Sequence, residues 1–181
     1  MSYQVGDKIT ELTLPNIAGE QFTLEQVKGK RYMLSFMRFA ACPFCQLRIH
    51  QLISNWQGFD DNFTVIAVFD SPLDNLQKQS SAQKAPFAIL ADEQAVYYHK
   101  FAIKQSVSGI FKAMLFRMPT LLYAMFVKRV FPLSIKGKVT TLPADFLVDE
   151  QGVIDSIYYG KDSGDHLSID SVKAFSSFQK N

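Results

Sequence analysis

The sequence predicts an α/β fold in which helices flank a mixed central β-sheet. Three apolar runs have the length of strands that are buried on both faces: residues 32–39 (YMLSFMRF), 63–70 (FTVIAVFD) and 87–92 (FAILAD). Residues 144–160 then predict two strands joined by a turn at 150–152. Strands that alternate with helices and close with a hairpin are typical of a helix–sheet sandwich in one domain.

An N-terminal hairpin is expected before the first buried strand. Residues 11–31 hold two short apolar stretches around Asn16 and Gly19, followed by a helical turn that ends at Gly29. Helices are expected further along the chain, at residues 43–56, 71–83, 93–102 and 167–178.

A helical insertion is expected at residues 106–135, which are rich in Phe, Met and Leu. Pro119 divides this segment into two predicted short helices. No internal repeat, low-complexity tract or linker is apparent, so residues 1–181 are predicted to form a single domain.

The composition indicates a soluble globular protein in a reducing compartment. Hydrophobic residues make up 48% of the 181 residues and charged residues 20%, and a chain of this length buries a core without disulfide cross-links. Two cysteines are too few for a secreted disulfide scaffold, and the polar N-terminus has no apolar segment of the secretory kind. The cytoplasm is the expected location.

The only two cysteines, Cys42 and Cys45, lie in the stretch FAACPFCQLRIHQL at residues 39–52. A structural disulfide, a metal site, a redox centre and simple core packing are four interpretations of such a pair. The free N–H groups of a helix start stabilise a thiolate, and two cysteines at this spacing close and open a disulfide with little backbone movement. The redox interpretation therefore expects both sulfurs close together and reachable from water.

Metal binding is the weakest of these interpretations. Zinc needs two further ligands, but the chain has no second cysteine pair, and its three histidines stand apart from one another. We expect no metal and no cofactor. His50, His99 and His166 are expected to be surface residues or satisfied core residues.

Two segments resemble the thioredoxin-fold peroxiredoxins of the alkyl hydroperoxide reductase and thiol-specific antioxidant type. They are VGDKITELTLPNIAGEQFTLEQVKGKRYMLSFMRFAACPFC and TTLPADFLVDEQGVIDSIYYG, and the resemblance covers roughly residues 5–70 and 139–178. It implies a thioredoxin-like fold and a thiol-dependent antioxidant enzyme. The chain is most similar to a peroxiredoxin-like subgroup that carries C-P-x-C.

The resemblance implies roles for particular residues. Pro143 matches the family's cis-proline loop, which would pack against the cysteines and leave the backbone of Leu142 free to pair with substrate. The family usually has P-x-x-x-T/S-x-x-C, whereas this chain has Arg38 in place of the proline and Cys42 in place of the Thr or Ser. Cys45 then holds the peroxide-reacting position.

Two assignments of the cysteines remain open. Aligned with thioredoxins, Cys42 attacks and Cys45 resolves, which gives a thiol–disulfide oxidoreductase; aligned with peroxiredoxins, Cys45 meets hydroperoxide and Cys42 resolves. Disulfide exchange is favoured because it needs only an exposed thiol of low pKa, a partner thiol and a groove. Arg38 or Arg48 would supply a guanidinium in the peroxidase. The expected substrate-binding residues are Arg38, Pro43, Phe44, Leu142 and Pro143.

The expected partners are a protein or small-molecule disulfide, or a hydroperoxide, together with a reducing thiol. The charge pattern raises a third reading, a non-catalytic docking module. Residues 94–144 contain eight Lys and Arg residues but no Asp or Glu, so this stretch has a charge of +8. Because the net charge of the chain is +2, the remaining residues together have a charge of −6. Residues 106–135 would serve as extra core, as a homodimer surface or as a weak contact with a membrane surface. No nucleic-acid motif accompanies the basic residues, so nucleic acid is not an expected partner.

Overall fold

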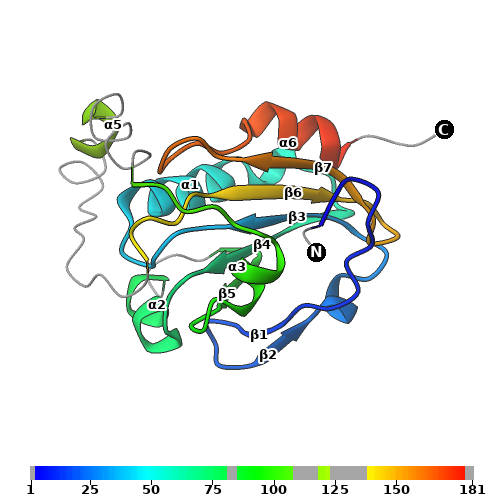
Figure 1. Cartoon of the computed structure of the whole chain (residues 1–181). Coiled ribbons are helices and arrows are strands. Elements are labelled where there is room, and N and C mark those ends of the chain that lie inside the picture. The colour runs from blue at the N-terminus through cyan, green and yellow to red at the C-terminus, as the bar shows by residue number, and fades with distance from the viewer. Residues whose placement is uncertain (1–2, 81–84, 108–117, 123–137, 178–181) are drawn as a thin grey trace.

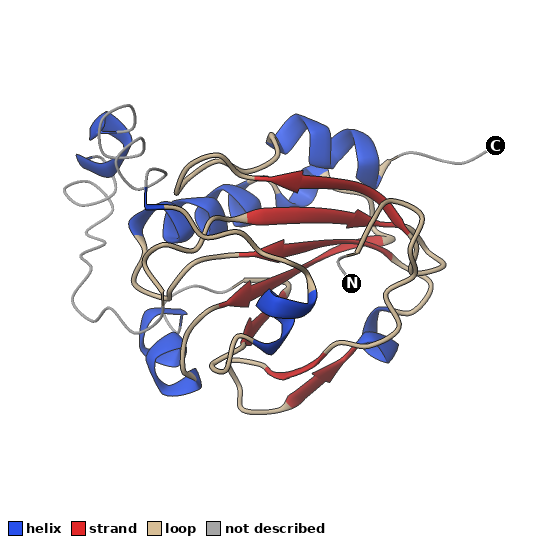
Figure 2. Ribbon diagram, viewed as in Figure 1, coloured by secondary structure: helices blue, strands red, loops and turns tan. Residues whose placement is uncertain are grey.

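The computed structural model describes residues 3–80, 85–107, 118–122 and 138–177, and its centre is a five-stranded mixed sheet (Figures 1 and 2). The strand order is β5–β4–β3–β6–β7. The strands are β3 (Arg31–Phe36), β4 (Phe63–Phe69), β5 (Ala88–Ala91), β6 (Ala144–Val148) and β7 (Ile154–Tyr159). Strands β3, β4 and β5 are parallel, whereas β6 runs antiparallel to β3 and β7 antiparallel to β6. The predicted mixed sheet is confirmed.

Both faces of this sheet are covered, which explains why its central strands are apolar along their whole length. Helices α1 (Pro43–Ser54), α2 (Leu73–Ser80) and α6 (Ile169–Ser176) contribute to the core on one face. The opposite core contains α3 (Val96–Lys100) and the N-terminal hairpin. Successive strand residues divide between the two cores: Met33 belongs to the first, and Leu34 to the second.

The smaller elements also follow the sequence. The hairpin consists of β1 (Thr13–Pro15) and β2 (Gln21–Thr23), and its turn at Asn16–Gly19 precedes the 3-10 turn η1 (Leu24–Val27). A second 3-10 turn, η2 (Trp56–Gly58), follows α1 where the prediction had one continuous helix to residue 56. Asn55, the residue between them, is the C-cap of α1: its N–H still donates to the carbonyl of Gln51, but its φ of −103° and ψ of 6° are no longer helical.

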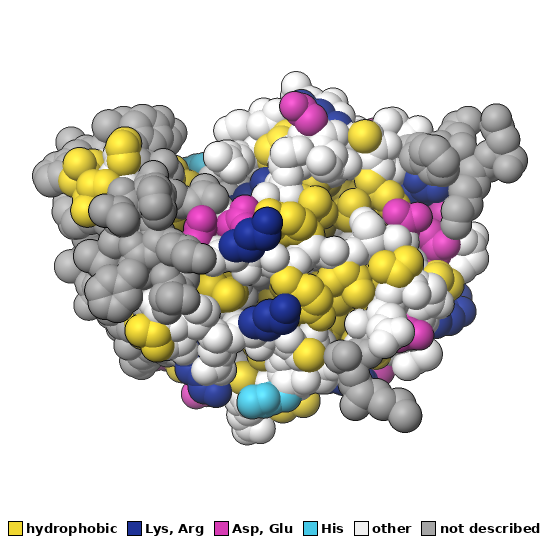
Figure 3. Space-filling view, turned by 45° about the horizontal axis from the view of Figure 1, so that its top comes forward, with side chains coloured by type: hydrophobic (Ala, Val, Ile, Leu, Met, Phe, Trp, Pro, Cys, Tyr) yellow, Lys and Arg dark blue, Asp and Glu magenta, His cyan; other side chains and the backbone are white. Residues whose placement is uncertain are grey.

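Most of the predicted insertion lies outside the described residues. The described part includes α5 (Met118–Leu122), and Pro119 is its second residue, a position that proline tolerates in a first turn. On the face turned to the viewer in Figure 3, the described Lys and Arg side chains are scattered among apolar ones. Within the described ranges, no helix has the length and apolar character that crossing a membrane requires.

Candidate redox site

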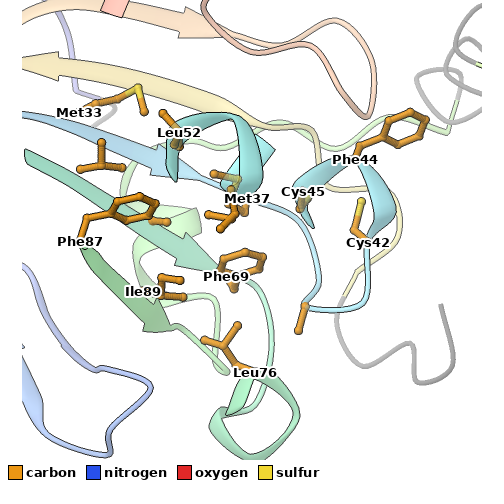
Figure 4. Close-up of a cluster of buried hydrophobic side chains, with 14 of the residues drawn as sticks. Met33, Met37, Cys42, Phe44, Cys45, Leu52, Phe69, Leu76, Phe87 and Ile89 are labelled. Atoms are coloured by element: carbon orange, nitrogen blue, oxygen red, sulfur yellow. The ribbon is translucent and has the colours of Figure 1, made fainter. Parts of the chain in front are cut away.

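The cysteine motif lies where the chain leaves β3 and begins α1. Cys42 is the residue before the helix, with φ −71° and ψ 119°, and Pro43 takes the first helical position. Proline suits this position because its missing N–H would have no partner in a first turn. Figure 4 shows Cys45 turned toward the core near Met37, Cys42 beside it, and Phe44 pointing away from both. The strand–CxxC–helix arrangement predicted from the sequence is therefore present.

Arg38 contacts both cysteines, one through its side chain and the other through its backbone. Its guanidinium Nη1 lies 3.4 Å from Cys42 Sγ, and its backbone N–H donates to Cys45 Sγ at 3.3 Å. The guanidinium is held from the other side because Nη2 donates to the backbone carbonyl of Val139. A proline at this position would have no N–H to offer Cys45, so the departure from the family pattern creates a contact.

The surroundings separate the pKa values of the two thiols. Burial alone raises the pKa of Cys42, but a hydrogen bond from Cys45, the positive charge of Arg38 and N–H groups of the first helical turn lower it to about 6. Burial raises the pKa of Cys45 well above its usual value, and its interaction with Cys42 raises it further. Cys42 is thus the thiolate near neutral pH, and Cys45 is its protonated partner.

Both cysteines are free thiols, and both are completely buried, with 0% of either residue exposed. The expectation that the sulfurs are reachable from water is therefore wrong for this conformation. Arg38 and Phe44 are buried beside them. A reactant therefore reaches Cys42 only if part of the covering chain moves, and a small reactant needs less movement than a large one.

The predicted cis-proline is wrong: the Leu142–Pro143 peptide bond is trans. The chain reaches β6 in an extended path because residues 140–142 pair with residues 104–106. Thr140 accepts from the backbone of Ser106, and the Leu142 N–H donates to the carbonyl of Lys104 at 2.9 Å. The Leu142 N–H is consequently already engaged. Pro143 is buried, and its carbonyl accepts from Gly160.

Arg48, the other guanidinium considered from the sequence, faces a different partner. Its Nη2 lies 3.9 Å from Asp145, which is fully buried on β6 and also contacts His166. Sequence reasoning did not single out Asp145. Asp145 could have been found as the single acidic residue inside an apolar strand, because a buried carboxylate requires a charged or hydrogen-bonding partner. Nothing in the sequence indicated that His166 would meet it.

Asp70 is a second residue that sequence reasoning missed. This buried carboxylate accepts from the Lys138 backbone at 3.2 Å and from the Thr141 hydroxyl at 3.0 Å. It therefore anchors the loop that presents Val139 to Arg38. Among the described residues, no group of His, Cys, Asp and Glu side chains is arranged to hold a metal ion.

A comparison with protein families matches residues 5–157 to the family described as AhpC/TSA. A Coxiella burnetii protein that carries the name peroxiredoxin bcp is 24% identical over 159 residues, which cover 87% of this chain and 89% of that protein.

Solved structures share the fold. BcpB, a peroxidoxin from Mycobacterium tuberculosis, superposes with a TM-score of 0.67 at 14% identity, covering 95% of this chain and 94% of its own. The Xanthomonas campestris bacterioferritin comigratory protein, studied for alkyl peroxide reduction, superposes with a TM-score of 0.62 at 17% identity, covering 90% of this chain and 88% of its own. A Chlorobium tepidum protein described as the thiol:disulfide interchange protein DsbE superposes with a TM-score of 0.56 at 17% identity, covering 87% of this chain and 86% of its own. The predicted thioredoxin-like fold is confirmed.

Proposed function

Because this chain belongs to the AhpC/TSA family, we propose that it is a thiol–disulfide oxidoreductase that uses Cys42 and Cys45 as a reversible dithiol pair. Family membership makes it a thiol-dependent, peroxiredoxin-like oxidoreductase. One observation supports the choice of these two residues: beside Arg38, the pKa of Cys42 is lowered and the pKa of Cys45 is raised. A thiolate beside a protonated partner thiol is the arrangement that a two-step exchange requires.

In the first step, the Cys42 thiolate attacks one sulfur of a substrate disulfide. A new bond forms between Cys42 Sγ and that sulfur, the substrate S–S bond breaks, and the second substrate sulfur leaves as a thiolate. The guanidinium of Arg38, 3.4 Å from Cys42 Sγ, stabilises the attacking anion before the reaction.

In the second step, Cys45 releases the enzyme from the mixed disulfide. Burial is the largest cause of the raised pKa of Cys45, and once Cys42 is no longer an anion the further increase due to Cys42 is lost. The Cys45 proton passes to the departing thiolate or to solvent, and the Cys45 thiolate attacks Cys42 Sγ. A Cys42–Cys45 disulfide forms, the second substrate thiolate leaves, and an external thiol reductant restores the pair.

The burial of both sulfurs favours a second candidate function, a thiol peroxidase. A hydroperoxide is small enough to reach a buried thiolate with less displacement of the chain than a protein disulfide needs. The thiolate attacks the terminal peroxide oxygen and the O–O bond breaks. A sulfenic acid forms on the cysteine, and the leaving alkoxide takes a proton from solvent to become an alcohol. The partner thiol then attacks the sulfenic sulfur, and water leaves as the disulfide closes.

The assignment of roles differs between alignment and electrostatics in this peroxidase. Alignment with the family pattern makes Cys45 the peroxide-reacting residue and Cys42 the resolving one. The low pKa of Cys42 and the position of Arg38 support the reverse order. The alkyl peroxide reduction described for the Xanthomonas campestris relative supports the reaction class.

Rapid mixing of the reduced protein with a small disulfide and, separately, with hydrogen peroxide tests both candidates. For the oxidoreductase we expect Cys42→Ser to abolish reaction with the disulfide and insulin reduction, and Cys45→Ser to accumulate a mixed disulfide on Cys42. For a peroxidase that starts at Cys45, Cys45→Ser stops peroxide consumption, and Cys42→Ser traps a sulfenic acid on Cys45. Mass spectrometry locates each adduct.

The same variants can also contradict the proposal. Retention of disulfide reduction by Cys42→Ser would contradict the assignment of Cys42 as attacking thiol. A disulfide reaction no faster than that of free cysteine, beside rapid peroxide consumption, would replace the proposal with the peroxidase.

Several partner predictions accompany this proposal. We place the enzyme in a reducing compartment, with a thiol reductant as its partner. Homodimerisation, membrane-surface contact and a docking role through residues 106–135 depend on a segment that lies mostly outside the described residues.

A further inference from the structure

A pocket of about 430 Å³ lies along α1, on the side that faces the segment leading into α6. Its described lining comes from the helix (Phe44, Leu47, Arg48, Gln51, Asn55) and from that segment (Gly164, His166, Leu167, Ser168, Ile169). Neither cysteine is among these residues. The pocket is therefore distinct from the sulfur site, although Phe44 belongs to both the pocket wall and the C-P-F-C motif.

Two of the lining residues, Arg48 and His166, belong to a buried cluster around Asp145, which itself does not line the pocket. His166 Nδ1 lies 3.1 and 3.2 Å from the two carboxylate oxygens of Asp145, and Arg48 lies 3.9 Å from the same carboxylate. The hydroxyl of Ser35 and the backbone N–H of Leu167 also donate to Asp145. Asp145 is thereby saturated, and its charge is balanced by Arg48.

The side chains of Arg48 and His166, in contrast, keep unused hydrogen-bonding atoms. The side chain of His166 is 4% exposed and that of Arg48 is 5% exposed. Nε2 of His166 and Nε of Arg48 are both buried and have no hydrogen-bond partner among the residues that the structure describes. Within the same residues, Arg48 Nη2 has a long contact of 4.0 Å to the sulfur of Met33 besides its contact with Asp145. Buried polar nitrogens without partners are unfavourable unless a ligand satisfies them.

We propose that this pocket binds a small organic carboxylate through Arg48 and His166. A carboxylate offers acceptors to a guanidinium in the geometry that arginine recognises well. The described lining contains no acidic side chain that would repel it, and the amides of Gln51 and Asn55 offer additional donors. The volume is in the range of pockets for small organic molecules, rather than for an inorganic ion alone.

The rest of the lining favours a ligand with an apolar body. Four apolar side chains contribute to the wall: Phe44, Leu47, Leu167 and Ile169. Burial of a ring or short chain against them adds favourable free energy roughly in proportion to the apolar area removed from water. The ligand class is thus a monocarboxylate with a hydrocarbon portion, with the carboxylate beside Arg48 and His166.

Calorimetric titration of the reduced, full-length protein with phenylacetate tests the proposal, with phenylacetamide as the neutral control of the same shape. We expect saturable binding of phenylacetate, and binding of the amide at least about tenfold weaker.

Three variants locate the site. Arg48→Met should weaken phenylacetate binding by about tenfold or more, since it removes the charged donor but keeps the volume. Gln51→Trp should block the pocket from its solvent side without touching the buried cluster, and it tests the site even if Arg48→Met fails to fold. Gln26→Trp, an exposed glutamine outside this pocket, is the matched control and should bind as the unaltered protein does.

The proposal is overturned by any of three results. These are no binding of phenylacetate at millimolar concentration, binding that Gln51→Trp leaves unchanged, or binding of phenylacetamide as tight as that of phenylacetate. None of these readouts depends on Cys42 or Cys45, so the thiol chemistry stands or fails separately.

Discussion

Arg38 contacts the sulfurs of both buried cysteines, in two different ways. Its guanidinium lies beside Cys42, whereas its backbone N–H donates to Cys45. Cys45 in turn lowers the pKa of Cys42 by hydrogen bonding to it. One residue therefore supports the anion directly and orients the thiol that also supports it.

Replacement of Arg38 by Met should raise the pKa of Cys42 from about 6 toward its ordinary value, because the positive charge beside the thiolate is lost. The thiolate fraction below the pKa falls about tenfold for each unit of increase. Alkylation rate against pH, with the modified cysteine assigned by tandem mass spectrometry, measures the change. Arg38→Lys keeps the charge and should shift the profile less, and coinciding profiles for all three proteins would contradict this role of Arg38.

At the scale of elements, the loop before β6 couples the end of β4 to the sulfur site. Asp70, directly after β4, binds the Lys138 N–H and the Thr141 hydroxyl. The loop between them carries the Val139 carbonyl that accepts from Arg38. Three segments that are distant in the sequence therefore meet at one guanidinium.

Asp70→Asn should loosen this loop, because a neutral amide is a weaker acceptor than a carboxylate. We expect faster alkylation of Cys42 in the native protein at a pH above its pKa, where thiolate formation no longer limits the rate, and a loss of about 1–2 kcal/mol in stability. Thr141→Val removes only one of the two hydrogen bonds and should have a smaller effect. An unchanged alkylation rate in Asp70→Asn would show that the loop does not control access.

For the whole molecule, the buried cluster around Asp145 joins β3, β6, α1 and the segment before α6. Burial opposes ionisation of Asp145, but His166, Arg48 and Ser35 overcome this and hold its pKa at about 2. The unfolded chain, with an ordinary aspartate near 3.8, binds a proton at a higher pH than the folded protein does. Folding stability from this residue is therefore complete above about pH 4 and is lost as the pH falls toward 2.

Urea unfolding from pH 6 to pH 3 should reveal this contribution, whose full size is about 2 kcal/mol by the linkage between pKa and stability. In Asp145→Asn, the protein should be less stable at pH 6, and the difference from the unaltered protein should shrink as the pH falls. A constant difference across this range would mean that Asp145 does not titrate with a depressed pKa. Replacing the exposed Asp170 in the same way provides the control.

The sheet, its order of strands and helices, and the cysteine pair at a helix start were predictable from the sequence, because apolar runs and helix-start residues are local signals. The opposite pKa displacements, the complete burial of both sulfurs, the trans Leu142–Pro143 bond and the Arg48–Asp145–His166 cluster were not. The last three depend on groups brought together from distant positions, such as Arg38 with Val139, Leu142 with Lys104, and Asp145 with His166. The pKa displacements depend on that burial and on the relative positions of Cys42, Cys45 and Arg38 in space. Charge and solvent access are set by these distances, which only the folded chain defines.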